Sequence, residues 1–210
     1  MSNVSRPMGH PDAVGRAIEL VRLFHDQSEW GDVVVESAAM DRLSRTLLAH
    51  RGHMTVAIES WIGGPVEVTV IQERRGQSAG GVGENVYARE ILLTGHFAGA
   101  QQLLQYGIVR IDLTTVPGPA AQLIREGRIP LGRVLISAGV HRDIQDVELV
   151  SIRVGRALSK ATGQSAGGIL SGRVATIRLG FEASPASDND DATVAAVELL
   201  EVLIPVKAAV

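Results

Sequence analysis

The chain of 210 residues contains no cysteine, which excludes disulfide bonds, thiol nucleophiles and zinc–thiolate sites. Aromatic residues are also scarce, with two Trp, two Tyr and three Phe. Acidic and basic side chains nearly balance, giving a formal net charge of −3, and no basic block stands out. Proteins that bind nucleic acids usually carry a basic patch or stacking aromatics. We therefore expect no nucleic-acid partner.

Long apolar runs are missing as well. No stretch approaches the roughly twenty apolar residues that a membrane-spanning helix needs, and the N-terminus lacks the apolar core of a signal peptide. We expect no membrane partner and a cytoplasmic location, with which the absence of cysteine is compatible. The histidines do not show the spacing of a helix-borne metal site, so we expect no metal. The sequence leaves the oligomeric state open.

Apolar residues recur with helical spacing near the N-terminus and with strand-like alternation afterwards. The pattern predicts helices over residues 10–27, 36–52, 117–129 and 156–163. It predicts strands over residues 53–62, 65–74, 85–95, 104–116, 146–155, 171–182 and 193–205. Residues 130–136 fit either a strand or a helical turn. Strands that follow one another through short polar or Gly-rich breaks favour antiparallel pairing, so we expect an α+β fold with a single antiparallel sheet and flanking helices.

The strand predicted over residues 85–95 carries a charge in an apolar row. Successive side chains of a strand point to opposite faces, so Arg89 shares one face with Tyr87 and Ile91. A half-buried strand normally sends its charges to the solvated face. Arg89 therefore either reaches solvent at the sheet edge or points into a cavity, where it meets an anion.

The last predicted strand contains two such charges. Glu201 shares a face with Leu199 and Leu203, which favour an apolar surrounding. Glu198 lies on the opposite face, whose row of side chains is equally apolar. A carboxyl group on an inward face either pairs with a cation or has its pKa raised by burial until it holds a proton near neutral pH. The second case makes it a candidate general acid. The alternative is that both are edge-strand charges, which discourage aggregation.

Four segments, taken in order, resemble the chorismate lyase family: HMTVAI (53–58), YAREILL (87–93), IPLGRVLI (129–136) and ELLEVLIP (198–205). The combination of REILL and PLGR is the most specific part of this resemblance. The resemblance implies a chorismate lyase-like fold, in which the sheet and its flanking helices enclose an internal ligand site. It also implies that this domain covers residues 37–210 and that an N-terminal arm and helix precede it over residues 1–36.

The resemblance further implies an activity. Chorismate lyases release pyruvate from chorismate and leave 4-hydroxybenzoate, without a cofactor. By motif position, Arg89 corresponds to the arginine that binds the ring carboxylate, and Glu201 corresponds to the buried acid near the ring hydroxyl. Met54 and Leu131 correspond to pocket residues beside the ligand. We therefore expect a cofactor-free carbon–oxygen lyase with Glu201 and Arg89 as its catalytic residues, and a small aromatic or cyclohexadiene carboxylate as its ligand.

One departure from the family pattern and the breadth of the fold leave alternatives. Ile108 follows Gly107 where lyases of the ubiquinone pathway have an arginine. Arg133 and Arg110 are the candidates for binding a second carboxylate. The same broad fold includes ligand-binding domains of some GntR-type transcription regulators, whose winged-helix reader we do not expect within residues 1–52. The alternatives are thus another cyclic carboxylate substrate in specialised biosynthesis, or a non-catalytic module that binds an aromatic acid.

Overall fold

The computed structural model describes residues 12–35, 40–76, 86–180 and 194–206. The elements in these ranges are α1 (Ala13–Arg22), α2 (Gln27–Trp30), β1 (Gly31–Val35), α3 (Arg42–Leu48), α4 (Met54–Ile62), β2 (Val66–Arg75), β3 (Val86–Phe97), β4 (Ala100–Asp112), the 3-10 helix η1 (Leu113–Thr115), α5 (Gly118–Glu126), α6 (Leu131–Ser137), β5 (His141–Val154), α7 (Arg156–Thr162), β6 (Ile169–Gly180) and β7 (Val194–Leu203). None of the helices in this part of the chain is long and apolar enough to cross a membrane.

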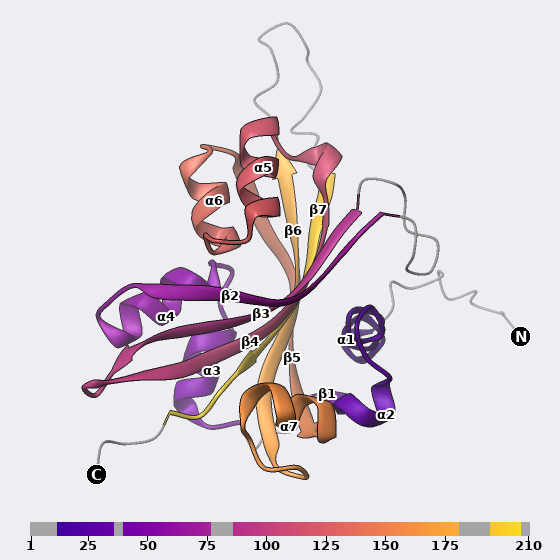
Figure 1. Ribbon diagram of the computed structural model, residues 1–210, viewed down its shortest axis with the longest axis vertical. Helices are drawn as coiled ribbons and strands as arrows, with labels where there is room; N and C mark the ends of the chain where they lie inside the picture. Colours follow the sequence, from indigo (N-terminus) through magenta and orange to yellow (C-terminus); the bar gives the residue numbers. More distant parts are fainter. Residues whose placement is uncertain (1–11, 36–39, 77–85, 181–193, 207–210) are drawn as a thin grey trace, which may run out of the picture.

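The strands form one antiparallel sheet in the order β1-β5-β6-β7-β4-β3-β2. The sheet twists strongly, and helices cover both of its faces (Figure 1). α1, α2 and α7 pack on one face, whereas α3 with α4 and α5 with α6 form two groups on the other. The predicted α+β class and the single antiparallel sheet are therefore confirmed.

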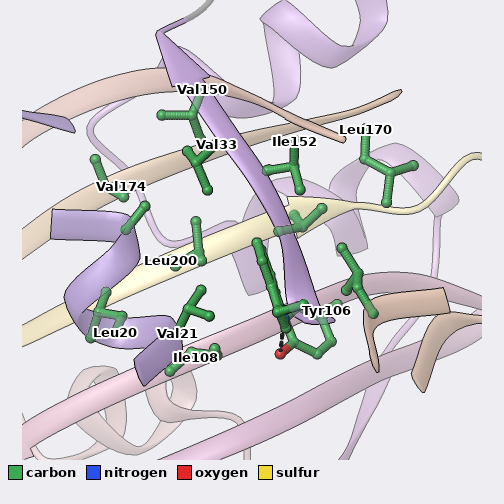
Figure 2. Packing of buried hydrophobic residues seen from close by; sticks show 14 of the residues in the cluster. Leu20, Val21, Val33, Tyr106, Ile108, Val150, Ile152, Leu170, Val174 and Leu200 are labelled. Atoms are coloured by element: carbon green, nitrogen blue, oxygen red, sulfur yellow. Dashed lines mark hydrogen bonds between the residues drawn. The ribbon is translucent and has the colours of Figure 1, made fainter. Parts of the chain in front are cut away.

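The face under α1 is filled by branched apolar side chains. Leu20 and Val21 of α1 pack on Ile108 of β4 and Leu200 of β7, the central strand (Figure 2). The start of α1 is fixed by Asp12, which caps the first turn by accepting a hydrogen bond from the Gly15 backbone N–H at 2.8 Å. The apolar stripe of the helix then lies on the sheet.

The opposite face is divided between two helix pairs. α3 and α4 cover the ends of β2, β3 and β4, and α5 and α6 cover the other end of the sheet. The first turns of α4 and α6 approach each other over the middle of this face. A small cavity remains at this junction, between the apolar cluster under α3 and α4 and the one under α5 and α6.

The structure corrects the sequence-based elements in two places. Residues 53–62, predicted as a strand from their β-branched side chains, form helix α4, because Met54 and Ile58 lie one helical turn apart and both pack on the sheet. β1 has no counterpart among the predicted strands, although its Val33 is buried in the core.

Three further predictions have different outcomes. Residues 130–136, which fitted either element, lie mostly in α6. The second predicted helix is described from Arg42 onwards, after its cap Asp41. The predicted domain boundary at residues 36–37 lies outside the described residues.

Gly155 provides a test of how α7 is joined to the first strand. A Cβ at this position would lie 2.5 Å from the Glu29 carbonyl oxygen and 2.7 Å from the Gly31 nitrogen. We expect Gly155→Ala to lower the free energy of unfolding by roughly 1–3 kcal/mol, because backbone atoms must move apart. Urea denaturation measures this loss.

Gly64→Ala is the matched control, because a Cβ there would meet no atom within 4 Å. Its free energy of unfolding should change by less than about 0.5 kcal/mol. Equal losses for the two variants would contradict the close approach at Gly155.

Candidate functional site

A small cavity of about 30 Å³ lies between the sheet and the first turns of α4 and α6. Three of the four residues singled out from the sequence, Met54, Leu131 and Glu201, line it together. The wider surface depressions of about 420 and 510 Å³ contain none of these residues. The cavity is therefore the candidate functional site.

Two glycines shape this cavity. Gly107 of β4 pairs with Ile91 on one side and Glu201 on the other, so the row of side chains across the sheet has a gap between them. Gly132 of α6 lies directly against the His53 ring, where a Cβ would be only 3.0 Å from the ring carbon Cγ. The first glycine opens the cavity towards the sheet, and the second lets the two helices close over it.

A β-bulge in β4 lies next to the polar group of the cavity wall. The pairing of β3 with β4 shifts between Leu93 and Thr94, which leaves Leu104 as the extra residue. As a result, Leu104 faces α4 instead of α1 and packs in the apolar cluster there, whereas Gln105 lines the cavity beside Met54 in regular alternation with Gly107 and Val109. Bulges often re-aim a side chain in this way next to functional sites.

Glu201 is held by an arginine that the sequence analysis did not single out. Arg173 of β6 is 1% exposed, and its Nε donates to Glu201 Oε2 at 2.6 Å. Its remaining nitrogens donate to backbone carbonyl oxygens at the end of α3 and in the α3–α4 connection, those of Leu48 (3.3 Å), His50 (2.7 Å) and Gly52 (3.1 Å). One side chain therefore links the acid to the segment that leads into α4.

This arrangement corrects the expectation of an apolar surrounding for Glu201. Of the two states open to a buried carboxyl group, the structure shows the one paired with a cation. The partner could have been found in the sequence, because Arg173 shares a strand face with the apolar Ala175 and Ile177, as Arg89 does with Ile91. The same test applied to β6 would have found it.

Arg89 is fully buried, as expected for an inward-facing charge, with 0% of its surface exposed. It does not line the cavity itself, but its strand partner Val109 and its same-face neighbour Ile91 do. Its Nη1 donates to the Ile124 carbonyl oxygen at 3.3 Å near the end of α5. Burial lowers the pKa of Arg89, while the nearby Tyr87 hydroxyl favours its charged form.

The guanidinium of Arg89 is satisfied on one side only. Among the described residues, Nε and Nη2 have no hydrogen-bond partner. These two nitrogens lie on the same edge of the planar group, and together they form the fork that binds a carboxylate through parallel hydrogen bonds. Arg89 therefore keeps two buried donors available beside the cavity.

His53, the N-cap residue of α4, contributes a neutral imidazole to the cavity. Its Nε2 accepts a hydrogen bond from Arg142 Nε at 2.8 Å. Burial, followed by the charges of Arg142 and Arg173, lowers the pKa of His53 to about 4. The ring is thus uncharged at neutral pH, which is what its role as an acceptor requires.

The residues proposed for a second carboxylate lie elsewhere. Arg133 points outward and pairs with Glu59 at 2.6 Å. Arg110 lies on the α1 face of the sheet, in an ion pair with Glu198. Neither arginine lines the cavity.

The α1 face also contains a buried acid. Glu90 is next to Arg89 in β3 and faces the opposite way. Its Oε1 accepts from the Tyr106 hydroxyl at 2.6 Å and lies 2.9 Å from His25 Nε2. The same tyrosine accepts from Trp30 Nε1 at 2.9 Å (Figure 2). This network ties α1 and α2 to the sheet.

The donor set of the cavity suits an organic anion. Within the described ranges, no three His, Asp or Glu side chains come together in a way that could hold a metal ion. The polar groups around the cavity are a guanidinium fork, an imidazole, an amide and a paired carboxylate, which can bind and orient a ligand by hydrogen bonds.

Comparison with known proteins yields structural neighbours alone. No protein-family model and no curated protein sequence matches the chain. PhnF from Mycobacterium smegmatis has a TM-score of 0.47 and 12% identity, over 73% of this chain and 64% of that chain. This chain therefore spans less than two thirds of the length of PhnF.

Two further solved structures give similar values. The effector domain of PhnF has a TM-score of 0.47 and 11% identity, over 72% of this chain and 88% of that chain. A transcriptional regulator of the GntR family from Bacillus cereus has a TM-score of 0.42 and 13% identity, over 67% of this chain and 92% of that chain. At these scores and identities, no ligand or activity follows for this chain from the likeness.

The Arg173–Glu201 pair predicts a large effect on stability. We expect Arg173→Met to lower the free energy of unfolding by roughly 3–5 kcal/mol, because Glu201 is left buried without its cation. Adding Glu201→Leu to this variant should recover part of the loss. Arg153→Met, at an exposed position of β5, is the control. Urea denaturation gives all three values, and a single-variant loss no larger than that of the control would contradict the pairing.

The lowered pKa of His53 predicts a pH dependence of stability. In the unfolded chain the imidazole has its ordinary pKa of 6.5, so it gains a proton before the folded protein does. Acidification from pH 8 to pH 5 should therefore cost about 2 kcal/mol of unfolding free energy through this residue. The His53→Gln variant lacks this contribution, so its loss over the same range should be smaller by that amount. Identical pH profiles would contradict the burial of a neutral His53.

Proposed function

We propose that the protein binds a small organic carboxylate beside Arg89, in the cavity between α4, α6 and the sheet. The observation that supports this best is the buried fork of Arg89, whose Nε and Nη2 have no partner in the described part of the chain. A buried arginine without a counter-ion is costly. A ligand carboxylate would remove that cost and would fit the two donors at once.

The local charges also favour an anion. Glu201 is the acid that lines the cavity, and Arg173 already pairs with it. Arg89 and Arg142 lie next to lining residues, and neither forms an ion pair with any residue of the described ranges. Glu73, the cross-strand partner of Arg89 in β2, bonds Tyr87 and Arg75 instead, so an anionic ligand would meet an Arg89 fork that no acid occupies.

On this proposal, the site must open to admit its ligand. Ligand pockets usually enclose about 300–1,000 Å³, whereas the cavity measures about 30 Å³. An aromatic acid can enter only if the first turns of α4 and α6 separate. Their contact, between His53 and Gly132, is the part of the lining that must open.

A lyase that acts on chorismate is the second proposal for the same site. It is supported by the convergence of Met54, Leu131 and Glu201, which the family resemblance named, around one cavity next to Arg89. Chorismate loses its C4 hydrogen and its enolpyruvyl group, and the gain of aromaticity drives the reaction. Held as a carboxylate by Arg173, Glu201 could orient a hydroxyl group or accept a proton, but it would not donate one.

Arg89→Ala tests the carboxylate site. We expect it to weaken the binding of 4-hydroxybenzoate by roughly 2–5 kcal/mol, the range for removing one partner of a buried charge pair. Arg89→Lys should restore little of this loss, because an ammonium group cannot form the two-pronged contact. Isothermal titration calorimetry measures both variants. Arg133→Ala, which removes an arginine outside the cavity, should bind as the wild type does. Unchanged affinity in Arg89→Ala would show that the anion binds elsewhere.

Pyruvate release from chorismate separates the two proposals. If the protein is a lyase, the wild type releases pyruvate and Glu201→Gln lowers turnover by roughly 10²–10⁴-fold, the usual contribution of a positioned acid or base. If it is a binding module, the wild type binds 4-hydroxybenzoate and releases no pyruvate. A lactate dehydrogenase-coupled assay on both proteins, with binding measured alongside, gives the answer.

A further inference from the structure

Gln105 is a buried amide whose acceptor is unused. It is 2% exposed and lines the cavity on the same face of β4 as Gly107 and Val109. Its Nε2 lies 3.4 Å from Glu201 Oε1, and its Oε1 has no hydrogen-bond partner among the residues that the structure describes. Buried polar atoms of native proteins are nearly always paired. An acceptor left over in the wall of a ligand cavity therefore points to a partner that comes with the ligand.

The neighbouring carboxylate determines how this amide is oriented. A carboxylate only accepts hydrogen bonds, so the NH₂ group of Gln105 faces Glu201 and the carbonyl oxygen is directed away from it. Arg173 occupies Glu201 Oε2 at 2.6 Å, which leaves Oε1 with the long contact to Gln105. This end of the cavity consequently offers two acceptor oxygens, one from Gln105 and one from Glu201, and each can take a further hydrogen bond.

We propose that Gln105 determines ligand specificity by requiring a hydrogen-bond donor on the ligand, such as a hydroxyl or amino group. This rests on the proposed carboxylate site at Arg89 and adds the second end of the ligand: a small acid with a donor group remote from its carboxylate. A ligand of this class pairs the acceptors of Gln105 and Glu201. A ligand without a donor buries both of them unpaired, which is the kind of mismatch that polar sites discriminate against most strongly.

Gln105→Met tests this with 4-hydroxybenzoate and benzoate, two acids that differ by one hydroxyl group. The wild type should bind 4-hydroxybenzoate roughly 5- to 100-fold more tightly than benzoate, the range for one buried acceptor left unpaired. In Gln105→Met we expect this ratio to fall by about fivefold or more, through weaker binding of the hydroxylated acid. Gln101→Met is the matched control, because Gln101 is an exposed glutamine on the same strand. Equal ratios in the wild type and in Gln105→Met would overturn the proposal.

The melting temperature of the ligand-free protein gives a second readout, independent of any ligand. If the Gln105 acceptor is spare, replacing the amide with an apolar side chain of similar size removes an unpaired buried group, and the melting temperature should stay the same or rise. If Gln105 serves only to brace Glu201, the same change should lower the melting temperature by more than about 4 °C, and the proposal is wrong.

The two readouts also separate the proposal from the function on which it rests. A wild type that binds neither acid would contradict the carboxylate site for aromatic ligands. The melting temperature of Gln105→Met would then still support or overturn the spare acceptor. A wild type that binds both acids equally well would leave the carboxylate site intact and would overturn the role of Gln105.

Discussion

The buried pair of Arg173 and Glu201 is the interaction on which the arrangement of this site depends. A charge inside a sheet face must be paired and hydrogen-bonded, or the folded state becomes too costly. Arg173 meets this demand with the acid of the neighbouring strand and with carbonyl oxygens at the end of α3. Those bonds hold the α3–α4 connection against the sheet. The first turn of α4, with His53 and Met54, is thereby brought over the cavity.

Two buried arginines on the same face serve different purposes, and their hydrogen bonds reveal the difference. Arg173 directs its guanidinium nitrogens to partners in the protein, so it contributes structure. Arg89 leaves one edge of its guanidinium unpaired, and Gln105 leaves its carbonyl oxygen unpaired. Such spare groups reduce stability and persist where the fold tolerates them for function. Spare donors near one part of the cavity and spare acceptors at another describe a ligand with an acid and a donor group.

Much of the fold could be predicted because strand alternation and turn residues are local signals. The strands β2, β3, β4, β6 and β7 follow from patterns of a few neighbouring residues, and antiparallel pairing is expected for strands that follow one another, whereas the pairing of β4 with β7 joins distant parts of the chain. α4 could not be predicted in this way. Its β-branched composition favours a strand, and it is a helix because Met54 and Ile58 bury together on the sheet at helical spacing. Tertiary packing overrode local propensity there.

The sequence by itself identified charges in apolar rows, since alternation states which side chains share a face, but it left open which of Glu198 and Glu201 is buried. Arg89 followed from that rule, and Glu201 from the family resemblance. Only the tertiary structure decided what these charges meet. Arg173 pairs with Glu201 across 28 residues of sequence, because β6 and β7 are neighbours in one register. Gln105 meets Glu201 across 96 residues of sequence because β4 and β7 are neighbours in the sheet. Alternation predicts the face to which a side chain points, whereas its contact partners depend on the register between strands that are distant in sequence.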